Sequence, residues 1–375
     1  MERNPDSREL NGSPGAARPD FMWATPDDDA EIRGLLGRVP MEGAVRTGFA
    51  REPSYFAYPE PAGAGERTLL ARLAGRLACL GALSEREVWL DGRATRVGYL
   101  AGLRMDPDVR GASRILREGY HRFTEYAKQS EAEVWFTSIA ADNPRARRVL
   151  ESHRLGLPRY SPIGELETRI IPVRSRSTPP DGIGIPHDAA ELDAFLNDEG
   201  QRRQLALTWN PARWSALARD GFGLAQVRVA RRNGRIVAAA GLWDQSKWKQ
   251  VVVHGYAPWM KRVRTCYNLW SSLRGCPGLP AAGRRLPLAY LFPFAVAPGG
   301  ESAMPALWAA MEMLARGAGV RWIAVGSASG DPIWSQAPLK RGGRVYRTTL
   351  YQVSNDPKPS EWWRTRPLRP EIALL

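Results

Sequence analysis

The fold is decided by the stretch from Val97 to Arg114, whose sequence is VGYLAGLRMDPDVRGASR. Its apolar first part predicts a strand that ends near Met105, because Pro107 cannot continue a ladder of hydrogen bonds. A short loop with Gly111 then leads into a helix predicted from about 113 to 128. Backbone N–H groups at a helix N-terminus, beside arginines, favour a bound phosphate. The alternative is a tight strand-to-helix turn that simply requires Gly111.

A second motif follows from Ser138 to Ser152, with the sequence SIAADNPRARRVLES. The apolar run 134–139 before it predicts a buried strand. Asn143 is a helix cap candidate, and Pro144 suits the first helical position, so we expect a helix that ends near His153. Asn143 is then either a cap alone or also a contact for a ligand.

The elements around these motifs complete one α+β unit. We predict a strand at 21–24, a helix through Arg38, and a hairpin of 69–73 with 77–83. The run 88–90 leads into Asp91-Gly92, a two-residue hairpin signal, and 95–105 is the next strand. A closing strand is expected at 164–173. The order is strand, helix, antiparallel strands, helix, strand, helix, strand.

The second half of the chain repeats this order more faintly. Asp188 and Glu191 form a capping-box pattern before a helix, and Asn233-Gly234 separates two strand runs. Further strands are predicted at 288–296, 322–325 and 345–353, with a helix at 305–316. We therefore predict two tandem α+β domains of one topology, at 21–173 and 186–355. A disordered tail (1–20), a linker (174–185) and a C-terminal coil on a surface (356–375) complete the chain.

In order and motifs the chain resembles the GNAT superfamily of N-acetyltransferases. The resemblance implies a twisted, mixed, mostly antiparallel sheet in each domain, flanked by helices and splayed between its fourth and fifth strands. It also implies that acetyl-CoA lies in that cleft of the first domain as acyl donor. The cofactor-binding residues implied are then Leu103, Arg104 and Met105 along the pantetheine arm, Arg110, Gly111, Ala112, Ser113 and Arg114 around the pyrophosphate, and Asn143 near the thiol.

The sequence departs from the family pattern at the loop and at the proton donor. Ser113 and Ile115 stand at the two glycine positions of the family loop. Leu150 stands where many members carry the tyrosine that protonates the leaving thiolate. Tyr99 and Tyr160 are the nearest titratable substitutes, with core packing as the alternative role. In the second half, the loop 297–302 has no arginine and carries a glutamate, so this domain is expected to be degenerate.

The composition is that of a globular protein. Of 375 residues, 43% are hydrophobic and 25% are charged, which excludes a disordered chain, a collagen-like fibre and a coiled coil. Cys79, Cys266 and Cys276 form no metal-binding spacing, and the histidines are far apart, so no metal site is expected.

The net charge of +14 invites a nucleic-acid hypothesis. The arginines are scattered, however, and a nucleic-acid partner is not expected. The longest apolar run, 286–297, is too short for a bilayer span, and the first twenty residues lack the apolar centre of a signal peptide. We expect a cytoplasmic protein without a membrane partner.

The sequence favours an acyl-CoA-dependent N-acyltransferase whose first domain moves acetyl to a primary amine by direct attack. Its acceptor is a small molecule or a peptide, and the chain is a monomer, as a pseudo-dimer of its two domains, or a homodimer. The first alternative is a catalytically inactive GNAT-like protein that binds acyl-CoA or acts as a scaffold. The second is a nucleic-acid-binding module.

Overall fold

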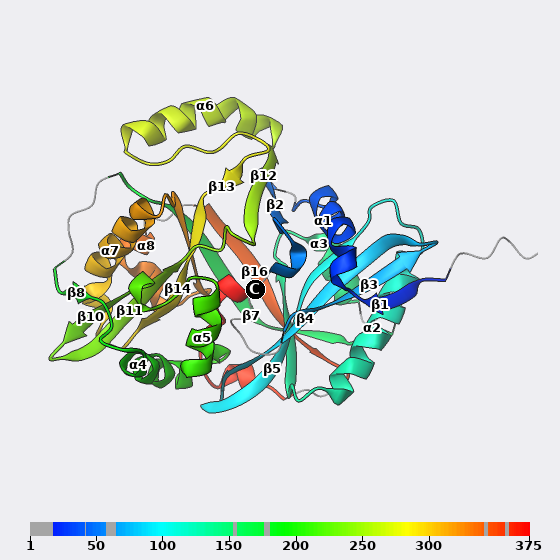
Figure 1. Cartoon of the computed structure of the whole chain (residues 1–375), viewed down its shortest axis with the longest axis horizontal. Helices are drawn as coiled ribbons and strands as arrows, with labels where there is room; N and C mark the ends of the chain where they lie inside the picture. The colour runs from blue at the N-terminus through cyan, green and yellow to red at the C-terminus, as the bar shows by residue number, and fades with distance from the viewer. Residues whose placement is uncertain are drawn as a thin grey trace, which may run out of the picture.

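The structure is a computed structural model that describes residues 18–41, 43–57, 65–152, 156–175, 181–340, 344–356 and 360–375 (Figure 1). Most of the predicted tail 1–20 lies outside these residues. So do the middle of the predicted linker 174–185 and the helix end predicted near His153.

The first half contains the elements predicted for it and one strand more, at 45–50, which was not predicted. They are β1 (Asp20–Trp23), α1 (Asp29–Arg38), β2 (Val45–Ala50), β3 (Arg67–Leu73), β4 (Arg76–Leu90), β5 (Arg93–Met105), α2 (Ala112–Gln129), β6 (Val134–Ala140), α3 (Pro144–Leu150) and β7 (Arg159–Pro172). The hairpins about Ala74-Gly75 and Asp91-Gly92 are confirmed. The two runs 77–83 and 88–90 were wrongly separated, since β4 is one strand. Glu85 and Arg86 in its middle are buried although they are charged. They interrupt the hydrophobic pattern, so the sequence did not indicate one continuous strand.

The second half follows with a similar order and several extra elements. They are β8 (Ile183–Gly184), α4 (Ala189–Gln201), β9 (Ala206–Leu207), α5 (Pro211–Arg219), β10 (Val227–Arg232), β11 (Arg235–Trp243), β12 (Gln250–Tyr256), α6 (Pro258–Leu273), β13 (Arg285–Leu286), β14 (Leu288–Val296), α7 (Met304–Gly317), β15 (Trp322–Ala328), α8 (Ala337–Lys340) and β16 (Arg344–Ser354). The hairpin about Asn233-Gly234 and the cap at Asp188 are confirmed.

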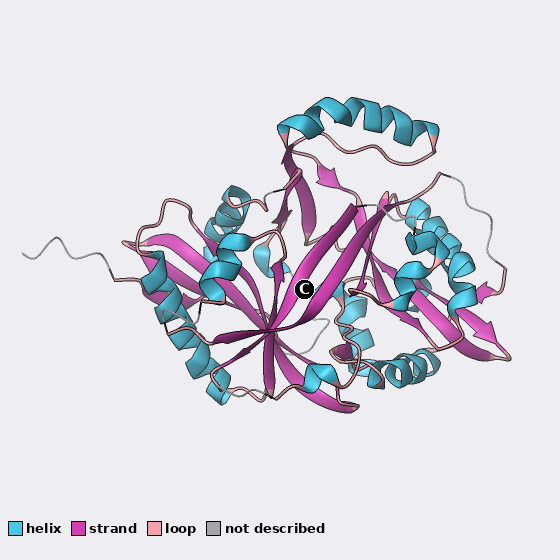
Figure 2. Ribbon diagram, turned by 180° about the vertical axis from the view of Figure 1, so that it is seen from behind, coloured by secondary structure: helices cyan, strands magenta, loops and turns pink. Residues whose placement is uncertain are grey.

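One sheet runs through both halves. Its strand order is β1-β3-β4-β5-β6-β16-β7-β15-β14-β11-β10-β8, and β9 pairs with β4. Figure 2 shows the strands crossing the middle of the molecule with helices on either side. A smaller sheet, β13-β12-β2, also combines strands of both halves. The fold is thus the predicted one of mixed sheets flanked by helices.

The closing strands of the two halves are exchanged. β16 comes from the second half, yet it lies antiparallel between β6 and β7. β7 comes from the first half, yet its other edge pairs with β15. Each half therefore supplies a strand that the sheet of the other half needs.

The C-terminal segment does not lie on a surface, as we had expected, but enters the core. Ile372, Ala373 and Leu374 form a buried turn. Arg369 donates to the Phe294 carbonyl at 2.7 Å, and the amide of Gln245 donates to the Ala373 carbonyl at 3.0 Å. The apolar side chains at the end of the segment explain its burial.

No helix in the described ranges is both long and apolar enough to cross a membrane.

Gly326 of β15 leaves room for the C-terminal segment to pack against this strand. A Cβ atom at this position would lie 2.1 Å from Cγ2 of Ile372. We expect Gly326→Ala to lower the free energy of unfolding by about 1–3 kcal/mol, because the buried segment must shift. Urea unfolding measures the change.

Gly37→Ala is the matched control, because a Cβ there, in the exposed part of α1, meets nothing within 4 Å. This variant should have the same free energy of unfolding as the unaltered protein, or one that is higher by up to about 1 kcal/mol. In the double variant that combines Gly326→Ala with Ile372→Ala, the loss in free energy of unfolding should be smaller than the sum of the two single losses. Additive losses would contradict the contact.

Candidate functional site

The candidate site begins where β5 and β6 separate. The two strands run parallel, but they pair only between Val97–Leu100 and Val134–Thr137. The Thr137 hydroxyl donates to the Leu100 carbonyl at 2.7 Å, which closes the paired part. Beyond it the strands carry on to Met105 and Ala140 without pairing to each other. A gap therefore opens between their C-terminal ends.

A β-bulge in β5 lies beside this gap. Ala101 pairs with Ala82 and Arg104 with Leu80, so that two residues, Gly102 and Leu103, face a single residue of β4. Gly102 has φ +64°, a left-handed conformation that favours glycine. A bulge takes backbone polar groups out of the ladder, and here they become available at the gap.

The gap opens into a large cavity of about 2450 Å³ that reaches into the second half. Its wall is mainly aliphatic and aromatic. The predicted residues Leu103, Arg104, Met105 and Asn143 line it, as do Tyr99 and Tyr160. The cavity thus brings together the two motifs and both tyrosines.

The predicted phosphate loop adjoins the cavity without lining it. Gly111 precedes α2 with φ +80°, and a Cβ there would meet nothing within 4 Å, so the space beside the loop is open. Arg110 and Ser113 are exposed, Ala112 is half-buried, and Arg114 forms an ion pair with Glu118 at 2.8 Å.

The bulky residue at a glycine position of the family loop does not fill this open space. Ile115 is buried in a cluster with Ala71, Ala78 and Cys79. Its side chain therefore packs against the sheet and leaves the backbone of the loop accessible.

Asn143 caps α3 at the opposite side of the gap. Its side-chain oxygen accepts from the Ala146 N–H at 3.1 Å. Pro144 takes the first helical position, so the sequence explains both features. Leu150 at the end of this helix is buried and lines the cavity, where the family tyrosine was expected.

The two tyrosines are suited to donate protons. The Tyr99 hydroxyl lies 2.8 Å from the Ser138 hydroxyl, and burial raises the pKa of Tyr99. The Tyr160 hydroxyl bonds to that of Tyr120, and burial, followed by Tyr120, raises the pKa of Tyr160 well above its usual value. Both phenols are therefore protonated at neutral pH, and neither is a base there.

A cluster of charged side chains, three from the first half and one from the second, lines the cavity. Arg51, Glu66, Arg86 and Lys249 all line the wall. Arg86 donates to the Leu374 carbonyl at 3.1 Å and stacks over the Tyr99 ring. It thus joins the tyrosine to the buried C-terminal segment.

Lys249 is the most unusual member of this cluster. Its Nζ lies 5.1 Å and 5.3 Å from the ring centres of Phe49 and Tyr290, and 3.4 Å from the main-chain oxygen of Leu375. Burial, assisted by Arg51, lowers the pKa of Lys249 to about 7. A substantial fraction of this amine is then neutral near pH 7 and able to accept a proton.

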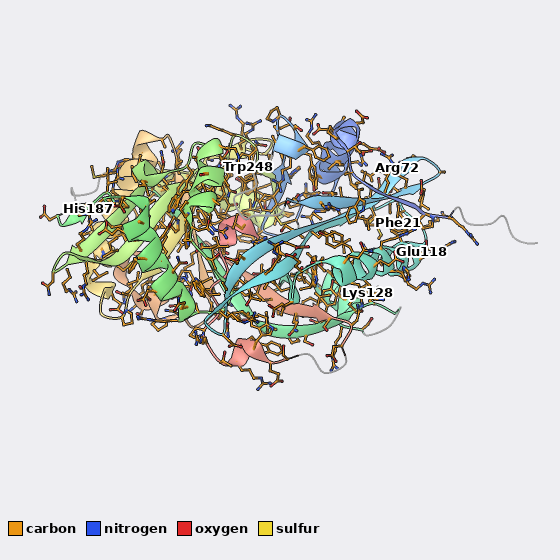
Figure 3. The ribbon with its side chains drawn as sticks, turned by 60° about the horizontal axis from the view of Figure 1, so that its bottom comes forward. Phe21, Arg72, Glu118, Lys128, His187 and Trp248 are labelled. Atoms are coloured by element: carbon orange, nitrogen blue, oxygen red, sulfur yellow. The ribbon has the colours of Figure 1, made fainter. Side chains whose placement is uncertain are left out.

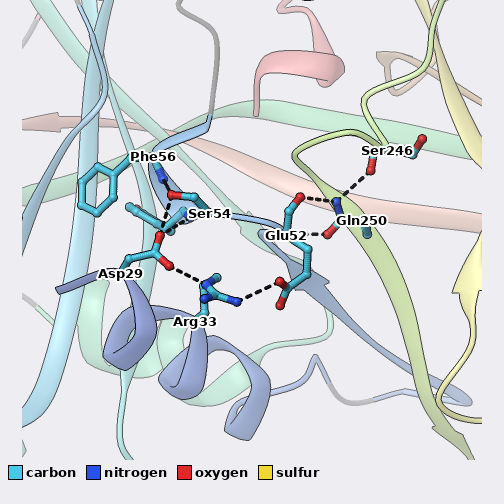
Figure 4. Close-up of polar contacts among 8 residues, drawn as sticks. Asp29, Arg33, Glu52, Ser54, Phe56, Ser246 and Gln250 are labelled. Carbon is cyan, nitrogen blue, oxygen red and sulfur yellow. Dashed lines mark hydrogen bonds and ion pairs between the residues drawn. The ribbon is translucent and has the colours of Figure 1, made fainter. Parts of the chain in front are cut away.

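Loop 51–57 and β12 are tied together beside the charged cluster (Figure 4). The amide of Gln250 donates to the Glu52 carbonyl at 2.8 Å, and the Glu52 N–H donates back to the Gln250 side chain at 3.0 Å. Arg33 of α1 forms an ion pair with Glu52 at 2.8 Å. These bonds hold Arg51 and Lys249, which are far apart in sequence, on one wall.

Trp248 fixes the backbone next to Lys249. Its indole N–H donates to Asp220 at 2.7 Å, and Trp243 donates to the other oxygen of that carboxylate at 2.7 Å. Figure 3 shows Trp248 near the middle of the molecule, far from Glu118 on α2.

Sequence reasoning missed Lys249, because a buried lysine has no local signal that separates it from an exposed one.

The corresponding gap in the second half is filled. β14 and β15 also run parallel and pair only at 288–290 with 322–324. Beyond that pairing, Arg369 bonds to Phe294 of β14 and Ile372 packs on Gly326 of β15. The chain's own C-terminal segment thus contacts both diverging strands.

No cluster of three or more His, Cys, Asp or Glu able to hold a metal is present among the residues described.

Asn143 permits a test that separates its structural role from a binding role. Asn143→Ala removes the cap of α3 and should lower the free energy of unfolding by about 1 kcal/mol in urea unfolding. Asn143→Asp keeps the acceptor for the Ala146 N–H and should retain the stability of the unaltered protein. Equal stability of all three proteins would contradict the cap.

No protein-family model matches the chain, and no curated protein matches it in sequence. Several solved structures are similar to the chain in fold. N-myristoyltransferase of Saccharomyces cerevisiae, solved with bound myristoyl-CoA and inhibitors, is 11% identical, with a TM-score of 0.55 over 93% of this chain and 82% of that one. A GCN5-related glucosamine N-acetyltransferase region in a fungal β-N-acetylglucosaminidase is 15% identical, with a TM-score of 0.54 over 92% of this chain and 39% of that one.

These likenesses extend over nearly the whole chain, so both halves take part in them. They show that the chain has the GNAT fold that its motifs resemble.

Proposed function

We propose that the protein is an acyl-CoA-dependent N-acyltransferase, with acetyl-CoA as its donor and a primary amine, on a small molecule or a peptide, as its acceptor. The observation that carries the proposal is the gap between β5 and β6, which opens beside the Gly102 bulge into the large cavity. In this proposal residues 21–173 hold the donor and residues 186–355 complete the acceptor side, in a cytoplasmic protein.

The donor fits the unpaired part of the gap. The pantetheine amides would bond to the backbone at Leu103, Arg104 and Met105, where β5 no longer pairs with β6. The pyrophosphate would lie at the start of α2, on the N–H groups of residues 111–113 and beside Arg110. The open space beside Gly111 supports this placement. Asn143 would hold the donor near its thiol through its side-chain amide.

Transfer needs an amine that has lost its proton and lies in line with the thioester carbonyl. The amine nitrogen attacks that carbon, a C–N bond forms, the C–S bond breaks, and the thiolate leaves with a proton. The backbone N–H groups freed at the bulge would polarise the carbonyl. Tyr99 and Tyr160 are the candidate proton donors to the thiolate, because both line the cavity and are protonated at neutral pH.

Lys249 is the candidate acceptor of the amine's proton. Its position in the cavity wall and its lowered pKa both support this role. Arg51 and Arg86 lie near it and favour its neutral form, and Glu66 opposes them. The positive cluster would also lower the pKa of a bound acceptor amine, which promotes attack.

Donor binding is tested by calorimetric titration with acetyl-CoA. Asn143→Asp should weaken binding about tenfold, because it loses the amide donor and adds a negative charge, while its stability is unchanged. Gly102→Val should weaken binding further by altering the bulge. Gly37→Ala is the control and should bind like the unaltered protein. If the unaltered protein takes up no acyl-CoA at all, the proposal fails.

The acid–base roles are tested by the pH dependence of kcat/KM. A neutral Lys249 must accept the proton, so the rate should rise as the pH passes through about 7 and then level off. Lys249→Met should lower kcat by about 10²–10⁴-fold and remove this step, and Lys249→Arg should not rescue it. Lys247→Met, at an exposed neighbour, is the control. An unchanged profile in Lys249→Met would assign the proton to another acceptor.

The second candidate is an inactive protein that binds acyl-CoA, and Leu150 favours it. It predicts saturable binding of acetyl-CoA without release of free thiol in the presence of any amine. Tyr99→Phe and Tyr160→Phe, measured separately, should slow thiol release only if the protein is active. A series of longer acyl donors determines how much of the 2450 Å³ cavity the acyl chain fills.

A further inference from the structure

Helix α6 carries a partly exposed apolar stripe beside the face that lines the cavity. Trp259, Val263, Cys266, Trp270 and Leu273 follow one another at alternating spacings of four and three, so they lie on one face of the helix. Trp259 is 59% exposed, Trp270 50% and Leu273 80%. Figures 1 and 2 both show α6 standing apart from the sheets at the edge of the molecule. Arg274 lies over the Trp270 ring at 4.0 Å, and the stripe is otherwise largely exposed. An exposed apolar stripe of this size indicates a binding surface.

The chain around α6 is strongly basic. From Gln245 to Gly300 it has eight lysines and arginines and no aspartate or glutamate. Lys261 and Arg262 of the helix are exposed, as are Arg274, Arg284 and Arg285 of the connection to β14. This segment therefore presents positive charge around an apolar stripe.

We propose that α6 and its basic flanks bind the surface of an anionic lipid bilayer. Apolar side chains, tryptophans among them, enter the boundary between headgroups and acyl chains, and lysines and arginines pair with anionic headgroups. The proposal is independent of the chemistry proposed for the cavity.

Charge distinguishes this partner from the alternatives. A second copy packed on the stripe would bring Arg262, which flanks the stripe, towards the Arg262 of the other helix, and no acidic side chain from 245–300 would compensate. A nucleic acid would satisfy the charges but would leave the tryptophans and Leu273 in water. An anionic bilayer pairs with the positive charges and also removes the apolar stripe from water.

The same helix forms part of the cavity wall. Met260, Tyr267 and Ser271 line the cavity from α6, and the half-exposed Trp259 and Trp270 line it as well. The bilayer-facing stripe is therefore continuous with the cavity at these two tryptophans. A bound bilayer would lie at the cavity mouth.

The sequence led us to expect no membrane partner, because the chain has no run long enough to span a bilayer. A helix that lies in the interface needs only one apolar face and a basic surround. α6 meets that requirement within 16 residues.

The test is cosedimentation of the full chain with two kinds of vesicle, phosphatidylcholine alone and phosphatidylcholine mixed in equal parts with phosphatidylglycerol. We expect binding to the anionic vesicles, weakened by added salt, and little binding to the neutral ones. Val263→Glu with Leu273→Glu should weaken it about tenfold or more. Lys261→Gln with Arg262→Gln should weaken it about 30-fold.

Met313→Glu is the matched control, since it places the same charge on an exposed apolar residue of α7. Far-UV circular dichroism and urea unfolding show that each variant is folded. A bimane label on Cys266, in a Cys276→Ser background, should shift to the blue on anionic vesicles, because Cys266 lies in the stripe.

Four outcomes would overturn the proposal. The first is equal or absent binding to the two kinds of vesicle. The second is anionic binding that none of the α6 variants changes. The third is a dimer in sedimentation equilibrium that Leu273→Glu dissociates, which would assign the stripe to a second copy. The fourth is vesicle binding abolished by equimolar duplex DNA, which would assign the charges to a nucleic acid.

Discussion

The exchange of β7 and β16 is the constraint on which the rest of the structure depends. β16 pairs with β6 along one edge and with β7 along the other, and β7 pairs in turn with β15. The two halves therefore share one ladder of backbone hydrogen bonds across their boundary. Because the cavity opens between β5 and β6 and ends at the second half, its two ends are held at a fixed separation by this ladder.

Local signals in the sequence were sufficient for most of the elements. Asp91-Gly92 and Asn233-Gly234 both form the predicted hairpins, and Asp188 and Asn143 both cap the predicted helices. These features depend on residues within a few positions of one another. The gap between β5 and β6, by contrast, followed from the resemblance to a family and not from any local pattern.

The features that the sequence did not predict are the non-local ones. A strand such as β16 has the same alternating pattern whichever half it joins, so its exchange is invisible in the sequence. The charged cluster of the cavity gathers Arg51, Arg86 and Lys249 from three separate segments. Burial of the C-terminal turn depends on contacts with Gly326 and Phe294. No residue near 372 in the sequence indicates these contacts.

The strand exchange also governs when the cavity can form during synthesis. The first half lacks the neighbour of β6 until β16 has left the ribosome, roughly 180 residues after β7, and translation of that length takes about 10–40 s. During this interval the edge of β6 is open, and its apolar residues Val134 and Phe136 belong to a core that is not yet closed. An open, apolar strand edge is prone to aggregation, and the cavity cannot be completed before β16 has been made.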